Sequence, residues 1–197
     1  MPFLRVKVES SVVVEIPTDN CNILGCRISG TRDDDDFAGL SAWSGIYGQG
    51  ADDVHRIWID SQPLASGQFV EVEFVTTGKK IGQGVPFDSS GSAEMPAGYS
   101  LEDDLHALAQ ELREQPWVRA AYRFRYESSL SAASEYSMAD DEYGFGFNVM
   151  WNDMHPDRVS VSLYAYTIDS VEQQRSGREL ACQHVALGQS CKISIVA

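Results

Sequence analysis

Apolar residues fall on every second position between Tyr143 and Trp151, a pattern typical of a β-strand with one buried face. The opposite face carries Gly144 and Gly146, and glycines inside a strand indicate a place where a backbone, a helix or a ligand comes close. A polar stretch over 152–158 contains Pro156 and separates this run from the alternating run 159–166. The sequence therefore predicts an antiparallel hairpin at the centre of the fold.

Further alternating or β-branched runs predict strands in both halves of the chain. In the first half they cover 3–8, 11–16, 24–28, 54–59 and 68–75, and in the second half they cover 117–126 and 188–196. In the run 37–47, small residues separate Leu40, Trp43 and Ile46. This spacing is ambiguous between a strand and a helix, and we predict a loop there.

One stretch has the pattern of an amphipathic helix, from Ser100 to Gln115. Ser100 with Asp103 resembles a capping box, and Pro116 follows the end. Its leucines are spaced by four, three and four residues, which places them on one stripe: Leu101, Leu105, Leu108 and Leu112. We therefore predict an α+β protein in which this one helix packs on the sheet of the second half.

The order of these elements predicts two β-rich units of antiparallel sheet. The first spans 1–80, a connection rich in Gly, Pro and Ser spans 81–99, and the second, α+β unit spans 100–197. The segment Leu64–Gln68 and the strand after it align with Val185–Gln189 and the strand after it. A pseudo-repeat explains this similarity, and so does chance likeness of two strands that each follow a Gly turn.

Charge narrows the range of functions. The chain has 29 acidic and 15 basic residues, a formal net charge of −14, and therefore repels nucleic acids and anionic membranes but attracts basic surfaces. We expect no nucleic-acid or membrane partner. The sequence shows neither a long apolar run nor a secretory signal, and its four cysteines form no CxxC pair. These features predict a cytoplasmic protein whose oligomeric state the sequence leaves open.

Two acidic runs stand out, 33–36 and the stretch from Glu127 to Asp157, where no Lys or Arg occurs. They predict either solvated loops or a surface that steers a basic protein partner. Tyrosines lie close to the second run in the sequence, and aromatic rings anchor many protein interfaces. The candidate partner-binding residues are Glu135, Asp140, Asp141, Glu142, Asp153, Tyr136, Tyr164 and Tyr166.

Catalytic and metal-binding motifs are not apparent in the sequence. No Gly-x-Ser-x-Gly elbow occurs, the four histidines are scattered, and the spacing of Cys182, His184 and Cys191 matches no closed zinc site. We therefore expect no catalytic residues, no metal and no cofactor, and we predict that the protein is not an enzyme.

The last third of the chain, with VALGQSCKISIV and the upstream WNDMHPDRVSVSLYAY, resembles small α+β proteins that act as immunity partners of bacterial toxins. The resemblance implies a non-catalytic inhibitor that occludes the active site of a toxin. Together with the charge, it favours an acidic binding protein that neutralises a basic effector toxin. The alternatives are a self-assembling phage or structural β protein, and a domain that binds a small ligand at the Gly144 and Gly146 face.

Overall fold

The computed structural model describes residues 1–48, 53–87 and 100–197. The chain is mostly β, with 55% of its residues in strands and 10% in helices, and the predicted α+β class fits this content. Residues 88–99 of the predicted connection lie outside the described part.

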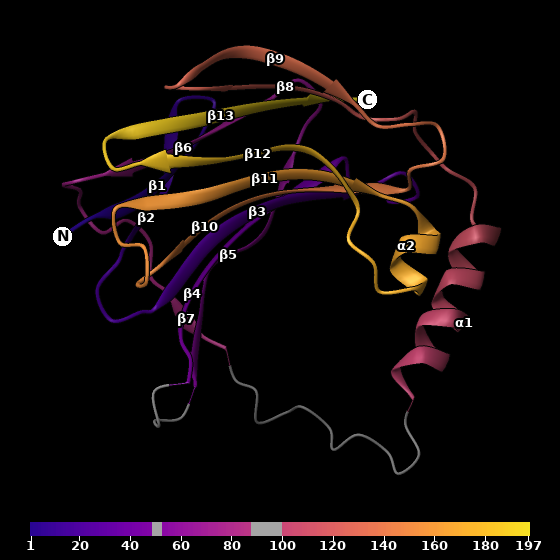
Figure 1. The fold of residues 1–197 in the computed structure, drawn as a ribbon, viewed down its shortest axis with the longest axis horizontal. Helices are drawn as coiled ribbons and strands as arrows, with labels where there is room; N and C mark the ends of the chain where they lie inside the picture. Colours follow the sequence, from indigo (N-terminus) through magenta and orange to yellow (C-terminus); the bar gives the residue numbers. More distant parts are fainter. Residues whose placement is uncertain (49–52, 88–99) are drawn as a thin grey trace.

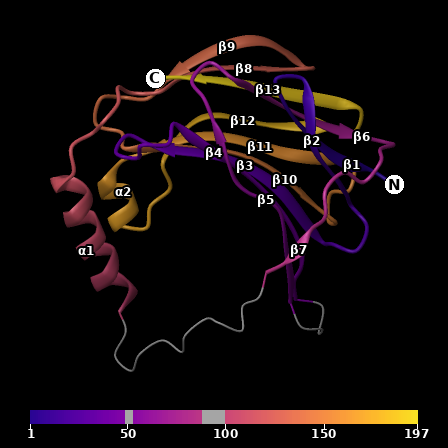
Figure 2. The same cartoon turned by 180° about the vertical axis from the view of Figure 1, so that it is seen from behind.

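The described strands form two antiparallel sheets that face each other as a sandwich (Figures 1 and 2). Sheet A contains, in spatial order, β2 (Ser11–Pro17), β1 (Phe3–Val8), β6 (Phe69–Val75), β13 (Gln189–Val196), β8 (Arg123–Ser128) and β9 (Ser131–Ser137). Sheet B contains, in the same sense, β12 (Arg178–Ala186), β11 (Arg158–Tyr166), β10 (Gly144–Asn152), β3 (Ile23–Thr31), β4 (Ala38–Ile46), β5 (Val54–Leu64) and β7 (Val85–Pro86).

The inward faces of both sheets meet in one large hydrophobic core. Every second residue of each central strand points inward, as the alternation predicted. Aromatic rings cross the gap between the sheets: Phe124 of β8 lies 5.0 Å from Phe145 of β10, and Tyr126 lies 6.0 Å from Phe147, centroid to centroid. The predicted hairpin of β10 and β11 is present at the centre of sheet B.

The predicted units 1–80 and 100–197 do not form separate bodies. Each sheet contains strands from both segments, because β6 pairs with β13 in sheet A and β3 pairs with β10 in sheet B. The shared core likewise draws residues from both segments. The sequence division failed because the pairing of distant strands depends on which faces complement each other in space, and local patterns do not record this.

The strand pairing of the first segment nevertheless recurs in the second. β1 pairs with β2 and β6 as β8 pairs with β9 and β13, and β3, β4 and β5 pair in series as do β10, β11 and β12. The aligned Gly turns also match: Gly67 and Gly188 have φ of 86° and 87°. In both turns the glutamine side chain accepts a hydrogen bond of 2.9 Å from the alanine N–H three residues earlier. The two segments therefore have the same topology, while a duplication event stays a hypothesis.

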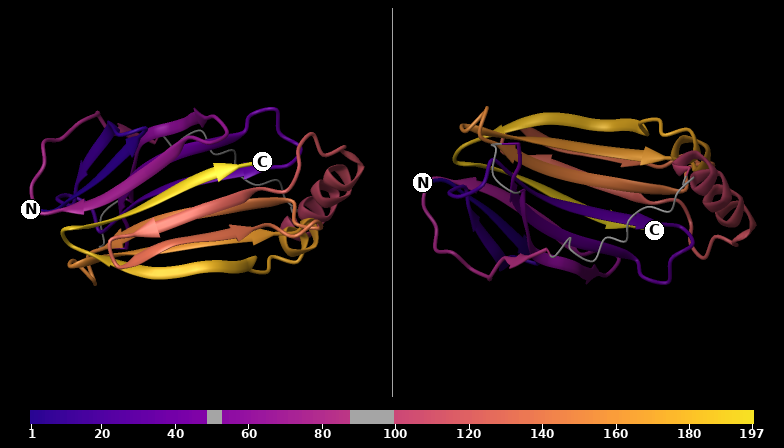
Figure 3. Two further views of the ribbon diagram at one scale, coloured as in Figure 1. Left: turned by 90° about the horizontal axis from the view of Figure 1, so that it is seen from above. Right: turned by 90° about the horizontal axis from the view of Figure 1, so that it is seen from below.

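The helix α1 (Leu101–Glu114) lies at one end of the sandwich, as Figure 3 shows, and does not lie across a sheet face. It packs against the short helix α2 (Ile168–Glu172), with Ala109 buried beside Tyr143 and Ile168. Leu101 and Leu108 are 51% and 42% exposed, so only part of the predicted leucine stripe is covered. Among the described residues, no helix combines the length and apolar content needed to cross a bilayer.

Two local expectations were wrong in sheet B. The segment 37–47, predicted as a loop, contains the strand β4, whose Ala38, Leu40 and Ala42 point into the core. β5 also continues through Pro63 to Leu64, beyond the end of the predicted run 54–59. Small side chains weakened the alternation in β4, although the same small volumes suit close packing between β3 and β5.

Candidate functional site

The outer face of sheet B carries two tyrosine rings that lie over glycines. Tyr164 and Tyr166 of β11 pair across the hairpin with Gly146 and Gly144 of β10. A Cβ added to Gly144 would lie 2.6 Å from the Tyr166 hydroxyl, and one added to Gly146 would overlap the Tyr164 ring. The glycines therefore let the rings lie flat on the sheet. The groups that come close to this face are thus the two tyrosine side chains.

Arg27 of β3 lies beside these rings, at the centre of the same face. It belongs to a strand whose Leu24, Cys26 and Ile28 point into the core, so the alternation directs Arg27 outward. Its Nε atom is buried and has no hydrogen-bond partner among the described residues. A buried N–H donor without a partner is costly, so Arg27 has hydrogen-bonding capacity that the described residues do not use.

A second arginine borders the site from the connection between α2 and β12. Thr167 caps α2, its hydroxyl accepting from the Ser170 N–H at 3.1 Å, and the chain then turns back through Arg175, Ser176 and Gly177. With Arg27, Tyr164 and Tyr166, these residues line a cavity of about 580 Å³, a size usual for small-molecule sites. A smaller cavity of about 180 Å³ adjoins it and shares Arg27 and Tyr166.

The charged groups that line the larger cavity are two arginines, Arg27 and Arg175, and one carboxylate, Glu179, so the lining carries a net positive charge that favours an anionic ligand. Neither Arg27 nor Arg175 forms an ion pair with a carboxylate in the described structure, although the chain has an excess of acids. Burial raises the pKa of Tyr166, while the charge of Arg27 acts in the opposite direction. Tyr166 is thus a neutral phenol at neutral pH and offers a hydroxyl, with Ser162 and Ser176 close by. We call the larger cavity, centred on these groups, the sheet B pocket.

Comparison with known protein families, with curated proteins and with solved structures finds no match. The interpretation of the pocket therefore depends on its own geometry.

The structure does not bring the predicted partner-binding residues together. Tyr164 and Tyr166 lie on the outer face of sheet B, whereas Glu135 and Tyr136 lie on β9 of sheet A. Asp153 follows β10, and Asp140, Asp141 and Glu142 precede it, so a nine-residue strand of about 30 Å separates them. The prediction assumed that residues close in sequence are close in space, but an extended strand holds the residues at its two ends far apart.

Glu142 is a structural residue. Its carboxylate is 4% exposed and accepts two hydrogen bonds from Arg178, at 2.9 and 2.8 Å, and one from the Ala139 N–H at 2.7 Å. Burial alone would raise the pKa of Glu142, and these hydrogen bonds outweigh it and hold the pKa below its ordinary value. Glu142 is therefore occupied within the chain.

The first acidic run, 33–36, lies at the same end of the sandwich as Asp140 and Asp141 of the second run. Arg32 donates to the backbone carbonyls of Asp140, at 2.7 Å, and Glu142, and Arg119 donates to the backbone carbonyl of Asp34. The carboxylates of Asp34, Asp35, Asp36, Asp140 and Asp141 form no ion pair with a described residue and belong to exposed positions. The first run and the part of the second run at Asp140 and Asp141 thus form one acidic end, while the rest of the second run lies elsewhere.

Groups suited to nucleophilic or metal chemistry are sparse in the described residues. Ser160 Oγ and His184 Nδ1 are 3.4 Å apart on the exposed face of β11 and β12, but no described group hydrogen-bonds to the other ring nitrogen of His184. Cys182 is exposed while Cys191 is buried. Within the part of the chain that the structure describes, no cluster of three His, Cys, Asp or Glu side chains could hold a metal ion.

Arg27 and Arg175 were missed by the sequence analysis. A single arginine that alternates with apolar residues looks like an ordinary solvated strand position, and Arg175 lies in a connection without a pattern. The available signal was an arginine flanked by Cys26 and Ile28 in a strand that otherwise has no charge.

Proposed function

We propose that this protein is a non-catalytic binding protein whose sheet B pocket holds a planar ligand with a carboxylate or phosphate group. The observation that carries the proposal is Arg27, which lines the cavity together with Tyr164 and Tyr166 and whose Nε has no hydrogen-bond partner among the described residues. A charge-assisted hydrogen bond from arginine to an oxyanion is stronger than a neutral one. The rings supply flat apolar surface for the remainder of the ligand.

Benzoate is a suitable probe, because it combines one ring with one carboxylate. At ten times its dissociation constant it should raise the free energy of unfolding by about 1.4 kcal/mol, which corresponds to a rise in Tm of about 3–6 °C. Benzamide, its neutral counterpart, should have little effect. Thermal unfolding followed by circular dichroism measures both.

Arg27→Gln should abolish the benzoate effect while the variant still folds, because the side chain lies on the outer face of the sheet. Arg56→Gln is the matched control, since Arg56 is an exposed arginine on β5 and does not line the pocket. An equal rise in Tm with benzoate and benzamide, or a benzoate effect that survives Arg27→Gln, would contradict the proposal.

A second candidate function uses the acidic end. The grouping of the run 33–36 with Asp140 and Asp141 supports an immunity-type role, in which the end with Asp34 and Asp140 meets a basic toxin and occludes its active site. Arg32 and Arg119 at this end hydrogen-bond to backbone carbonyls and form no ion pair with these carboxylates. Self-assembly through strand edges has no comparable support and stays a prediction.

The acidic-end hypothesis predicts a specific salt dependence. A basic protein captured by the wild-type chain at low salt should be released as ionic strength rises, because exposed charges are screened beyond about 8 Å at physiological salt. The double substitution Asp140→Asn with Asp141→Asn should reduce capture at low salt several-fold. Equal capture by wild type and variant, measured by quantitative mass spectrometry, would exclude this end as the binding surface.

A further inference from the structure

The outer face of sheet A carries a closed ion-pair network in the first segment. Arg5 of β1 lies between two carboxylates, hydrogen-bonding Glu15 of β2 on one side and Glu73 of β6 on the other, the latter at 2.9 Å. Lys7 also reaches Glu73, at 2.5 Å. Burial alone would raise the pKa of Glu73, and hydrogen bonds from Lys7 and Arg5 outweigh it and lower the pKa. Every charge of this network has a partner within the chain.

The repeated topology places a corresponding arginine in the second segment. Arg125 of β8 pairs with Glu135 of β9 and with Ser194 of β13, just as Arg5 pairs with Glu15 and Glu73. Ser194 therefore stands where the first segment has the carboxylate of Glu73. One negative charge of the pattern is missing on this side, while the arginine remains.

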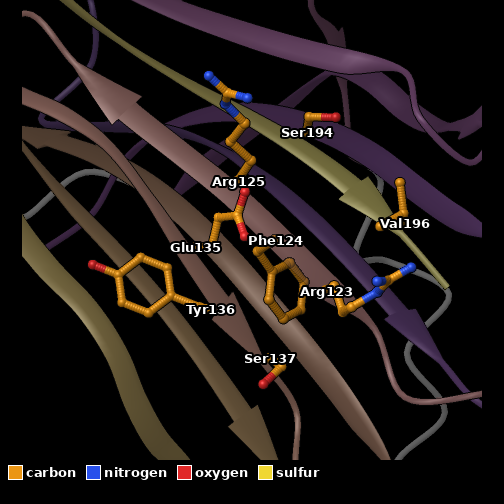
Figure 4. Close-up of a pocket in the computed structure, with 8 residues that line it drawn as sticks. All are labelled: Arg123, Phe124, Arg125, Glu135, Tyr136, Ser137, Ser194 and Val196. Atoms are coloured by element: carbon orange, nitrogen blue, oxygen red, sulfur yellow. The ribbon is translucent and has the colours of Figure 1, made fainter.

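A cavity of about 430 Å³ occupies this place (Figure 4). Arg123 and Arg125 border it from β8, Glu135 and Ser137 from β9, and Ser194 from β13. Neither Arg123 nor Arg125 forms an ion pair with any described carboxylate, Glu135 included. Val196 of β13, which pairs with Arg123, adds apolar lining next to the guanidinium groups.

We propose that this cavity binds a small carboxylate, which takes the position that Glu73 occupies in the first segment. The first segment is the template for the contact: a carboxylate on the strand next to the arginine receives a guanidinium hydrogen bond at 2.9 Å. Arg123 supplies a second donor, and the volume leaves room for a short carbon chain beyond the carboxylate. The site is separate from the sheet B pocket, since the two cavities open on outer faces of different sheets.

Glutarate is the probe, and its neutral diamide, glutaramide, is the control. In a titration followed by ¹H–¹⁵N NMR, glutarate should shift amide signals of β8, β9 and β13 in a saturable manner, and glutaramide should not. Arg125→Gln should weaken glutarate binding at least tenfold. Arg27→Gln should leave it unchanged, so failure of this proposal and failure of the sheet B proposal are distinguishable.

Substitutions at Ser194 give a sharper test. Ser194→Glu restores the carboxylate of the template and should abolish glutarate binding by occupying the cavity. Ser194→Ala removes only a hydroxyl and should change the affinity by less than threefold. Ser194 lies on the sheet surface, and matching NMR spectra outside the cavity confirm that both variants fold. Unaltered glutarate binding in Ser194→Glu, the absence of saturable shifts in β8, β9 and β13, or binding of an acidic peptide without binding of glutarate would overturn the proposal.

Discussion

Replacing Phe145 by alanine is expected to lower the free energy of unfolding by about 3–5 kcal/mol. Phe145 is fully buried near the start of β10, and its ring lies 4.7 Å from that of Tyr122 and 5.0 Å from that of Phe124, centroid to centroid. The substitution removes ring contacts from both sheets at once and leaves a cavity that rigid neighbouring strands cannot fill. Urea unfolding measures the loss.

The same experiment tests whether the chain is one cooperative body. Because strands of both sequence segments share each sheet and one core, far-UV circular dichroism and tryptophan fluorescence should report a single coincident transition in the wild type and in Phe145→Ala. Met154→Ala is the control: Met154 is 78% exposed in a turn, and its loss should change stability by less than about 0.5 kcal/mol. Two separate transitions would show that the segments unfold independently.

The strands whose side chains alternate strongly were predictable from the sequence. β6 and β10 have a clear period of two, and α1 has a capping serine and a leucine repeat. β4 and β9 were not predicted as strands, since β4 is built of small residues and β9 is almost entirely polar and exposed. The order of strands within each sheet could not be predicted, because it depends on contacts between residues far apart in the chain.

The candidate sites likewise include residues that the sequence identifies and residues that only the fold identifies. Tyr164 and Tyr166 were recognisable as aromatic residues on the face opposite the core, and the glycines beneath them indicated a close approach. Arg27 could not be recognised as a candidate binding residue from the sequence, because its place in the site depends on the pairing of β3 with β10. Arg125 could be recognised as a candidate binding residue only by comparison with Arg5, which requires knowing that β8 corresponds to β1. Sequence patterns predict on which face of a strand a residue lies, whereas only the fold shows which residues are its neighbours on adjacent strands.

Charge was the least predictable feature. Glu142 counted as part of an acidic surface, yet it is the buried partner of Arg178. Glu127 likewise lies 3.6 Å from Lys192. A net charge of −14 therefore does not describe one continuous surface, because strand pairing brings distant cations to some acids and leaves others exposed.

Removing the partner of Glu142 is the second substitution with a large expected effect. Arg178→Ala leaves a nearly buried carboxylate with only the Ala139 N–H as a donor, and it should lower the free energy of unfolding by about 3 kcal/mol at pH 7. We expect the lower end of the range for buried pairs, because the Arg178 side chain is 51% exposed. Glu142→Gln removes the charge, and should cost less. The double variant should be more stable than Arg178→Ala alone.

The pH dependence distinguishes lost charge pairing from lost packing. In the wild type the pKa of Glu142 lies below its ordinary value of 4.5, so the ionised carboxylate adds stability above that pH, and the gain disappears as pH falls through the lowered pKa. In Arg178→Ala burial dominates and raises the pKa of Glu142, so protonation relieves the unpaired charge in acid. The difference in unfolding free energy between wild type and Arg178→Ala should therefore shrink from pH 7 to pH 4. A difference that stays constant over this range would mean that Arg178 acts through its packing. The free energy of unfolding of the double variant would then be no larger than that of Arg178→Ala.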